Sequence, residues 1–302
     1  MKNGGAPHKP ILLLSIIEQF EQGLFFDEHI SIEPQLVATF KALWATLVVT
    51  KHDPIFALPF YHMRSEPFWT LVANPGCELW VESKSSMRSF TNLNTALRYA
   101  IIDRDLADLL CIPENRAVLR DVLLTAYFPE AAMGRVNLYE PPVATAHMLN
   151  ESATAYQQNL VELKRQLSTE SYQEEVYVRS GLFKREIPRI YHNTCAISGM
   201  RVDALTTASM IDACHIVPFS EGYNDTLGNG IALCPNLHRA FDRGLISLSD
   251  NYTVLVNKNF VENDRSVFNL RQLEGISIRL PDNVEHHPAL ENLWEHRRKF
   301  GY

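Results

Sequence analysis

The segment 211–244 constrains the fold of this chain more than any other part of it. His215 lies in a β-prone apolar run that Pro218 ends, so it is expected on a strand. His238 and Asp242 are four residues apart in a helical pattern, and side chains at this spacing project from one face of a helix. One strand and one helix are therefore predicted to bring two imidazoles and a carboxylate together.

These residue types suit the metal-assisted hydrolysis of a phosphodiester. An imidazole with a pKa near its usual value of about 6.5 can accept a proton from water at neutral pH. A divalent ion held by His and Asp neutralises charge on a phosphate and stabilises the leaving oxygen. Asn229 begins the element after a turn, in a helix expected around 229–243, and an asparagine can fix the orientation of an imidazole. The pattern assigns the His, Asn and Asp residues to three separate tasks.

Length and composition place the chain in the ordinary globular class. It has 302 residues, of which 46% are hydrophobic and 21% charged, and this length suggests two domains. The longest apolar stretch, 11–17, is far too short to span a bilayer, so we expect no membrane contact and a cytoplasmic location. The five cysteines are an odd number spread through a long chain, which predicts reduced thiols.

The charge balance argues against a protein that coats nucleic acid by bulk charge. The formal net charge is −7, with 14 Lys and Arg against 20 Asp and Glu in residues 1–174 and 14 against 15 in residues 175–302. Any contact with nucleic acid must therefore depend on local groups. Arg239 and Arg243 share the expected helix with His238 and are candidates for phosphate contacts.

Helical spacing and breaks divide the chain into parts. Helices are expected over 10–22, 34–49, 92–100 and 114–127. The apolar runs 68–72 and 78–81 flank Asn74-Pro75-Gly76, which is typical of a β-hairpin. Breaks after Pro129 predict a first domain over 1–135, a partly helical linker over 136–178 and a second domain over 179–302.

The segment 211–244 resembles the HNH nuclease family and its ββα-metal fold. His215 matches the first His of the family motif, Asn229 the Asn and His238 the final His, with gaps of 14 and 9 residues. The resemblance implies that His215 is the general base, that Asn229 orients it and that His238 binds a divalent metal, Mg²⁺ or Mn²⁺. Asp242 falls one helical turn later, where some members have a further metal ligand. The similarity covers roughly 180–300 and extends to bacterial restriction endonucleases.

Cys214 is a departure from the family pattern. Many members have an acidic residue or a His at the position before the first His. A thiol is a poor ligand for Mg²⁺, although it is compatible with softer ions. Either Cys214 binds the metal, or Asp212 or water supplies the missing oxygen and Cys214 only packs. Asp225 is expected to serve the turn formed with Asn224.

The remaining cysteines of this region depart from the family in a second way. Relatives often carry paired CxxC knuckles, whereas here Cys195 is followed by Ser198 and Cys234 by Leu237. Half of each pair is missing, so no Cys₄ zinc site is expected. The alternatives are thiols that pack in the core, or an unusual metal site formed by Cys195, Cys234 and a His.

The N-terminal region, over about 5–130, resembles the sulfur-binding domain of phosphorothioate-dependent restriction endonucleases. The resemblance rests on three runs, at 6–14, 58–69 and 126–129. It implies binding of double-stranded DNA in which sulfur replaces a non-bridging phosphate oxygen. Sulfur is larger and less strongly hydrated than oxygen, so a cup of proline and aromatic carbon can favour it.

Candidates for both parts of such a site occur in this region. Pro59, Phe60 and Tyr61 have the chemistry of the cup, or else they belong to the core. The remaining phosphate charge needs donors, for which the resemblance indicates His8, Lys9, Lys84 and Arg88. His8 and Lys9 lie where a helix is expected to begin, which itself favours an anion.

Together these features predict an α+β chain with an N-terminal mixed helix and small-sheet DNA-recognition domain and a C-terminal ββα-metal HNH nuclease domain. The expected function is metal-dependent restriction of modified DNA, with phosphorothioate DNA as the first choice. One alternative is an HNH restriction endonuclease for unmodified or base-modified DNA. Another is a catalytically silent DNA-binding protein, which Cys214 would favour. A double-strand break by a single nuclease site implies a homodimer or two successive cuts.

Overall fold

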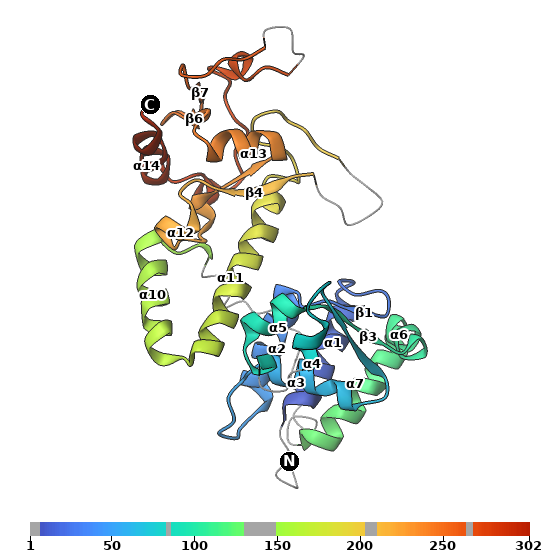
Figure 1. Ribbon diagram of the computed structural model, residues 1–302. Helices are drawn as coiled ribbons and strands as arrows, with labels where there is room; N and C mark the ends of the chain where they lie inside the picture. Colours follow the sequence, from blue (N-terminus) through green and yellow to red (C-terminus); the bar gives the residue numbers. More distant parts are fainter. Residues whose placement is uncertain (1–6, 83–85, 130–148, 203–209, 264–267) are drawn as a thin grey trace. The chain divides into compact units, whose positions relative to one another are not determined.

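A computed structural model describes residues 7–82, 86–129, 149–202, 210–263 and 268–302 (Figure 1). The chain is α+β, with helices and small antiparallel sheets. It separates into two compact units, one comprising residues 1–143 and 163–178 and the other residues 144–162 and 179–302. The range 136–178, expected as a linker, thus contributes to both units.

The first unit is built around helix α1 (His8–Glu21). Every residue from Pro10 to Phe20 is buried except Leu13, and the helix ends before Gly23, whose φ is +68°. A helix that is apolar on nearly all sides needs neighbours on all sides. Helices α2 (Pro34–Leu47), α3 (Ala57–His62), α6 (Arg104–Cys111) and α7 (Pro113–Tyr127) pack against it. The helices expected over 10–22 and 34–49 are present in this unit as α1 and α2.

The other elements of the first unit follow in chain order. They are β1 (His29–Ile30), α2 (Pro34–Leu47), α3 (Ala57–His62), η1 (Met63–Ser65), β2 (Trp69–Ala73), α4 (Glu78–Glu82), η2 (Ser86–Arg88), α5 (Phe90–Ala96), β3 (Leu97–Ile102), α6 (Arg104–Cys111) and α7 (Pro113–Tyr127). The strands form an antiparallel sheet in the order β1-β3-β2.

Two predictions in this unit were wrong. The run 78–81 is helix α4 and not the second strand of a hairpin, although a turn does follow Asn74. Strand β2 pairs instead with β3, a largely apolar and partly buried run from Leu97 to Ile102. For the same reason the helix expected over 92–100 ends at Ala96.

The second unit contains the segment 211–244, with the two histidines and Asp242. Its elements are α10 (Ala153–Gln166), α11 (Thr169–Ile190), β4 (Asp212–His215), α12 (Phe219–Gly222), η3 (Leu227–Asn229), β5 (Gly230–Leu233), α13 (Pro235–Asp242), β6 (Ile246–Leu248), β7 (Val254–Val256), η4 (Leu270–Leu273), η5 (Val284–His286) and α14 (Leu290–Phe300). The first part of α11 and the end of α10 are grouped with the first unit.

Strands β4 and β5 form an antiparallel pair on which α13 packs. His215 lies opposite Gly230 in the register. The helix expected around 229–243 is therefore a strand followed by a helix. All four residues of β5 are buried, and Pro235 stands in the first turn of α13, where a missing N–H costs nothing.

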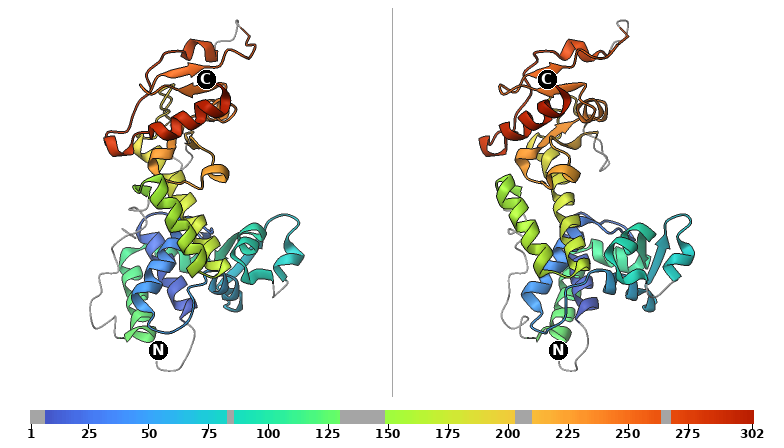
Figure 2. Two further views of the ribbon diagram at one scale, coloured as in Figure 1. Left: turned by 90° about the vertical axis from the view of Figure 1, so that its left-hand side faces the viewer. Right: turned by 60° about the vertical axis from the view of Figure 1, so that its left-hand side comes forward.

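Helices α14, α10 and α11 complete the second unit around its two small sheets. Helix α14 packs on β6, and Figure 2 shows it beside the β6 and β7 strands. The N-terminal half of α10 and the C-terminal half of α11 lie side by side in Figures 1 and 2, with Arg179 of α11 over the ring of Tyr156 of α10. A Cβ atom at Gly230 would stand 2.2 Å from Ile187 Cδ1 and 2.9 Å from Phe183 Cε2, so glycine lets α11 approach β5 closely.

Candidate functional site

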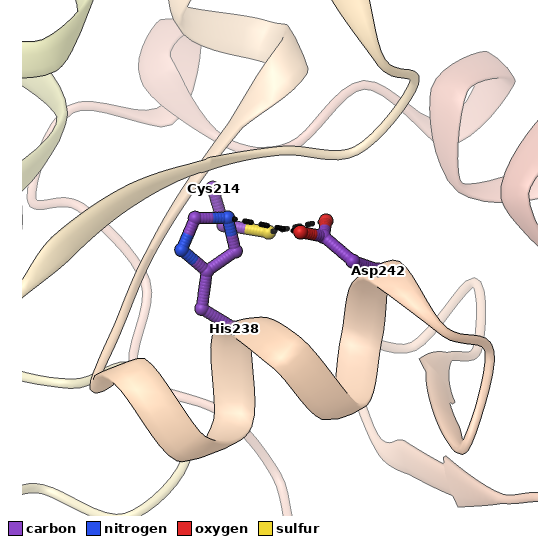
Figure 3. A group of neighbouring side chains, drawn as sticks. All are labelled: Cys214, His238 and Asp242. Atoms are coloured by element: carbon purple, nitrogen blue, oxygen red, sulfur yellow. Dashed lines mark hydrogen bonds and ion pairs between the residues drawn. The ribbon is translucent and has the colours of Figure 1, made fainter.

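Three donor atoms of different kinds meet between β4 and α13 (Figure 3). The sulfur of Cys214, a ring nitrogen of His238 and a carboxylate oxygen of Asp242 all lie within 4.8 Å of one another. His238 Nε2 is 3.4 Å from Asp242 Oδ2, and Cys214 Sγ is 3.9 Å from Asp242 Oδ1. His238 and Asp242 meet because they are one helical turn apart, and β4 supplies Cys214 from the strand beneath them.

Asp212 orients His238 from the other side of the ring. Its Oδ2 is 3.1 Å from His238 Nδ1. Asp212 and Cys214 are two residues apart on β4, so both face α13. A carboxylate accepts a hydrogen bond only, so this contact places the proton of His238 on Nδ1 and leaves the Nε2 lone pair toward Asp242. Carboxylates hold metal-binding histidines in the same way.

Cys214 is fully buried between these acidic groups. Burial, followed by the negative charges of Asp242 and Asp212, raises the pKa of its thiol well above the usual value. Without a metal the thiol therefore keeps its proton at neutral pH. The three donor atoms fit a divalent ion, and binding through sulfur would release that proton. Sulfur, nitrogen and oxygen together suit a softer ion better than Mg²⁺.

His215, the next residue of β4 after Cys214, is not one of these three side chains. Its ring stacks on Phe183 of α11, with centroids 4.0 Å apart and an interplanar angle of 10°. Its Nε2 is 2.8 Å from Oδ1 of Asp225. The side chain is 20% exposed, and among the described residues no group bonds to Nδ1. An imidazole held in this way has one nitrogen committed to the protein and one able to meet water.

Asn229 acts on the backbone around His215 and does not touch the imidazole. Its side chain is completely buried. Oδ1 accepts from the Val217 N–H, and Nδ2 donates to the carbonyls of Val217 and Asn224, each at 2.9 Å. The Ile216 N–H donates to the Asn229 carbonyl at 2.9 Å. Asn229 thus fixes both the residues after His215 and the loop that carries Asp225.

The sequence predicts a role in a turn for Asp225 and does not reveal its contact with His215. Its side chain is fully buried, and Tyr156 donates to its second oxygen at 3.4 Å. Nothing in the local pattern distinguishes Asp225 from an ordinary turn residue. Its partners are His215 of β4 and Tyr156 of α10, the latter 69 residues away in the sequence.

The other cysteines and arginines of this region have different settings. Cys195 and Cys234 are both buried and their thiols interact, with Ser198 N–H donating to Cys195 Sγ at 3.5 Å. No third metal-binding side chain joins them among the described residues. Arg239 and Arg243 are exposed on α13.

In the first unit, Pro59, Phe60 and Tyr61 belong to the core. All three are buried in α3. The ring of Phe60 packs between Phe56 and Trp69, and Tyr61 donates to the Val81 carbonyl at 2.8 Å. The sequence allowed these three residues to form either a sulfur-binding cup or part of the core. The structure corrects the first interpretation, because all three side chains are buried in the core.

The expected phosphate donors are partly engaged with protein groups. His8 Nε2 is 3.0 Å from the Asp53 carbonyl. Lys9 pairs with Glu66, and Arg88 is exposed. Lys84 lies outside the described residues.

Basic side chains nevertheless gather near the start of α1. His62 is exposed at the end of α3. Partial burial, and then the positive charges of Arg64, Lys9 and Arg88, lower the pKa of His62. Four basic groups therefore lie close enough to act on one another, which the sequence positions 9, 62, 64 and 88 do not reveal.

Residues 195–249 match the family model described as HNH endonuclease. The match contains His215, Asn229, His238 and Asp242. A solved structure described as a modification-dependent TagI restriction endonuclease matches with 21% identity and a TM-score of 0.33. That match covers 41% of this chain and 39% of the other. No curated protein matches the chain. None of the described helices is long and apolar enough to cross a membrane.

Proposed function

On the premise that residues 195–249 form an HNH endonuclease domain, we propose that this chain is a DNA endonuclease that hydrolyses phosphodiester bonds with a divalent metal ion. The observation that carries the proposal is the group formed by Cys214, His238 and Asp242 on the strand and helix of that domain. His215 follows Cys214 directly in β4, so a base and a metal-binding group arise from adjacent residues.

In this proposal His215 is the general base. Its Nδ1 accepts a proton from water, the water oxygen attacks phosphorus, and one phosphorus–oxygen ester bond breaks. The negative charge of Asp225 stabilises the imidazolium that forms. Asn229 keeps the loop behind His215 in place. Arg239 and Arg243, exposed on α13, contact phosphates on either side of the reacting one.

His238 and Asp242 hold the metal ion, with Cys214 as a third ligand. The ion, Mg²⁺ or Mn²⁺, supplies Lewis-acid stabilisation of charge on the phosphate. Asp212 keeps the Nε2 lone pair of His238 available for it. A sulfur ligand favours Mn²⁺ of the two, because Mg²⁺ prefers oxygen more strictly.

The N-terminal domain, over 1–135, is proposed to select modified double-stranded DNA, with phosphorothioate DNA as the first choice, for restriction in the cytoplasm. The basic side chains Lys9, His62, Arg64 and Arg88 support a contact with phosphates there.

Cutting both strands calls for a homodimer or two successive cuts. A chain that cuts unmodified or base-modified DNA, or that binds without cutting, is the second candidate. The buried, protonated thiol of Cys214 favours the chain that binds DNA without cutting it, because a protonated thiol is not a metal ligand.

A matched cleavage assay tests the proposal. Wild type, His215→Ala and His286→Ala are incubated with Mg²⁺ or Mn²⁺ on one plasmid prepared with and without phosphorothioate. His286 is a control from the same unit, outside the site. We expect wild type and His286→Ala to cut only the modified plasmid, and His215→Ala to bind it without cutting. Equal cutting of both plasmids would contradict the sulfur selection alone, and no cutting by wild type would contradict the nuclease.

A further inference from the structure

The fully buried carboxylate of Asp225 lies next to His215, and the proton transfer proposed above does not require the carboxylate to be buried. Asp225 is 0% exposed and its Oδ1 is 2.8 Å from His215 Nε2. A buried charged side chain is costly unless it is paired and hydrogen-bonded. A carboxylate only accepts hydrogen bonds, so the short contact places the ring proton of neutral His215 on Nε2. The Nδ1 lone pair is then free to accept a proton.

The second oxygen of Asp225 is held by a residue far away in the sequence. Tyr156 of α10 donates to Oδ2 at 3.4 Å, and its side chain is 0% exposed. Burial, followed by the charge of Asp225, raises the pKa of Tyr156, so its hydroxyl remains a donor at every working pH. Arg179 of α11 lies over the ring of Tyr156, with Cζ 5.1 Å from the centroid. Both oxygens of Asp225 therefore have a partner. Beyond Tyr156, the buried guanidinium of Arg179 supplies a positive charge.

The plane of the imidazole is fixed as well. Phe183 of α11 stacks on the His215 ring within 10° of parallel. Phe183 is itself 0% exposed and lies against Gly230, the residue opposite His215 in the sheet. The ring therefore has one face covered by Phe183, one nitrogen bound by Asp225 and the other nitrogen open.

We propose that Asp225 is a positioning residue for His215 and that Tyr156 holds Asp225 in place, so that α10 and α11, which precede the matched segment 195–249, complete the nuclease site. The inference rests on the proposed function for its catalytic meaning. The geometry it describes is testable without cleavage. Orientation by a carboxylate sets the tautomer and direction of a histidine base, and its loss acts on the chemical step more than on substrate binding.

The first test measures cleavage kinetics on a DNA that wild type cuts. Asp225→Asn keeps the shape of the side chain but can offer an N–H where His215 needs an acceptor. We expect kcat to fall about 10²-fold or more and KM for DNA to change less than about threefold. Asp282→Asn, an exposed aspartate of the same unit paired with His192, should leave both unchanged. A folded Asp225→Asn variant with wild-type kcat would overturn the proposal.

Tyr156→Phe provides a milder variant in case Asp225→Asn does not fold. It removes only the hydroxyl and keeps the ring under Arg179. We expect kcat to fall about three- to tenfold with KM unchanged, because one of two contacts to Asp225 is lost. Wild-type kcat in this variant would overturn the role given to Tyr156.

The second test does not depend on activity. The ¹⁵N signals of the His215 ring, assigned by comparison with His215→Ala, report which nitrogen carries the proton at a pH where the ring is neutral. We expect the Nε2–H form in wild type and in Asp282→Asn, and a loss of this preference in Asp225→Asn. The Nδ1–H form in wild type would overturn the proposal. A wild type that shows the Nε2–H form but cuts no DNA would keep the geometry and overturn the proposed function.

Discussion

The two site histidines differ in the ring nitrogen that a carboxylate holds. His215 is bound through Nε2 by Asp225, and His238 through Nδ1 by Asp212. Because a carboxylate only accepts hydrogen bonds, the nearer carboxylate of each neutral ring favours the proton on the nitrogen that it contacts; for His238 this is Asp212 at 3.1 Å and not Asp242 at 3.4 Å. The free lone pair is then Nδ1 in His215 and Nε2 in His238. This difference suits one ring to accept a proton and the other to bind a metal beside Asp242.

Cys214→Ser tests whether sulfur contributes to the metal site. Serine places an oxygen where the wild type has sulfur, so the variant should accept Mg²⁺ relatively better. We expect the ratio of the Mn²⁺-supported to the Mg²⁺-supported cleavage rate to fall several-fold. Cys195→Ser, which changes another buried thiol of the same unit outside the metal group, should keep the wild-type ratio. An unchanged ratio in Cys214→Ser would mean that Cys214 only packs.

Sequence spacing predicted part of the site and could not predict the rest. The i, i+4 spacing of His238 and Asp242 predicted their shared helix face, and the structure brings them together with Cys214. The contacts of Asp225 with His215 and of Asp212 with His238 became visible only in the tertiary structure. Spacing along one helix is a local property, whereas the pairing of Asp225 with His215 depends on a loop closure that Asn229 secures.

The close approach of α11 to β5 depends on the absence of a side chain at Gly230. In Gly230→Ala the new Cβ would overlap Ile187 and Phe183, both 0% exposed. Overpacking of this kind costs about 1–3 kcal/mol, so we expect the free energy of unfolding in urea to fall by that amount. Gly228→Ala is the control, since its Cβ would meet nothing nearer than 3.4 Å. Equal stability of the two variants would contradict the packing described.

Buried short elements were the hardest to predict. All four residues of β5 are buried, so they show no alternation, and apolar periodicity does not separate such a strand from the start of a helix. The run 78–81 had the opposite problem: three successive apolar residues after a turn are typical of a strand, yet Leu79 is 83% exposed and the segment forms α4. The long helices α1 and α2 were predicted because their apolar residues repeat over several turns.

In the molecule as a whole, the described part of each unit contains a buried carboxyl or imidazole group that resists charging. In the first unit, burial raises the pKa of Glu174 to about 7, against the opposing effect of Lys41 at 3.6 Å; its Oε1 accepts from the Phe56 N–H at 2.9 Å. In the second, burial lowers the pKa of His296 to about 4, although the Phe241 carbonyl opposes the shift. His296 also bonds Ser247, which ties α14 to β6. The two shifts predict opposite pH dependence.

Acidification should therefore move the stability of the two units in opposite directions. Glu174 has a higher pKa folded than unfolded, where it is near 4.5, so its contribution is complete below pH 4.5 and is lost as pH rises to about 7. His296 has a lower pKa folded than unfolded, where it is near 6.5, so its contribution is complete above pH 6.5 and is lost as pH falls to about 4. Each shift is equivalent to about 3 kcal/mol.

Thermal unfolding between pH 7 and 4.5 measures these opposite changes in stability. Glu174→Gln and His296→Gln are each compared with wild type, so that the contributions of all other titrating groups are the same on both sides of the comparison. We expect wild type to gain stability on acidification relative to Glu174→Gln, in the transition of the first unit. We expect it to lose stability relative to His296→Gln, in the transition of the second. If either variant ran parallel to wild type across this range, the buried group that it replaces would not titrate as described. If wild type changed in the same sense relative to both variants, one of the two pKa shifts would have the opposite sign to the one described.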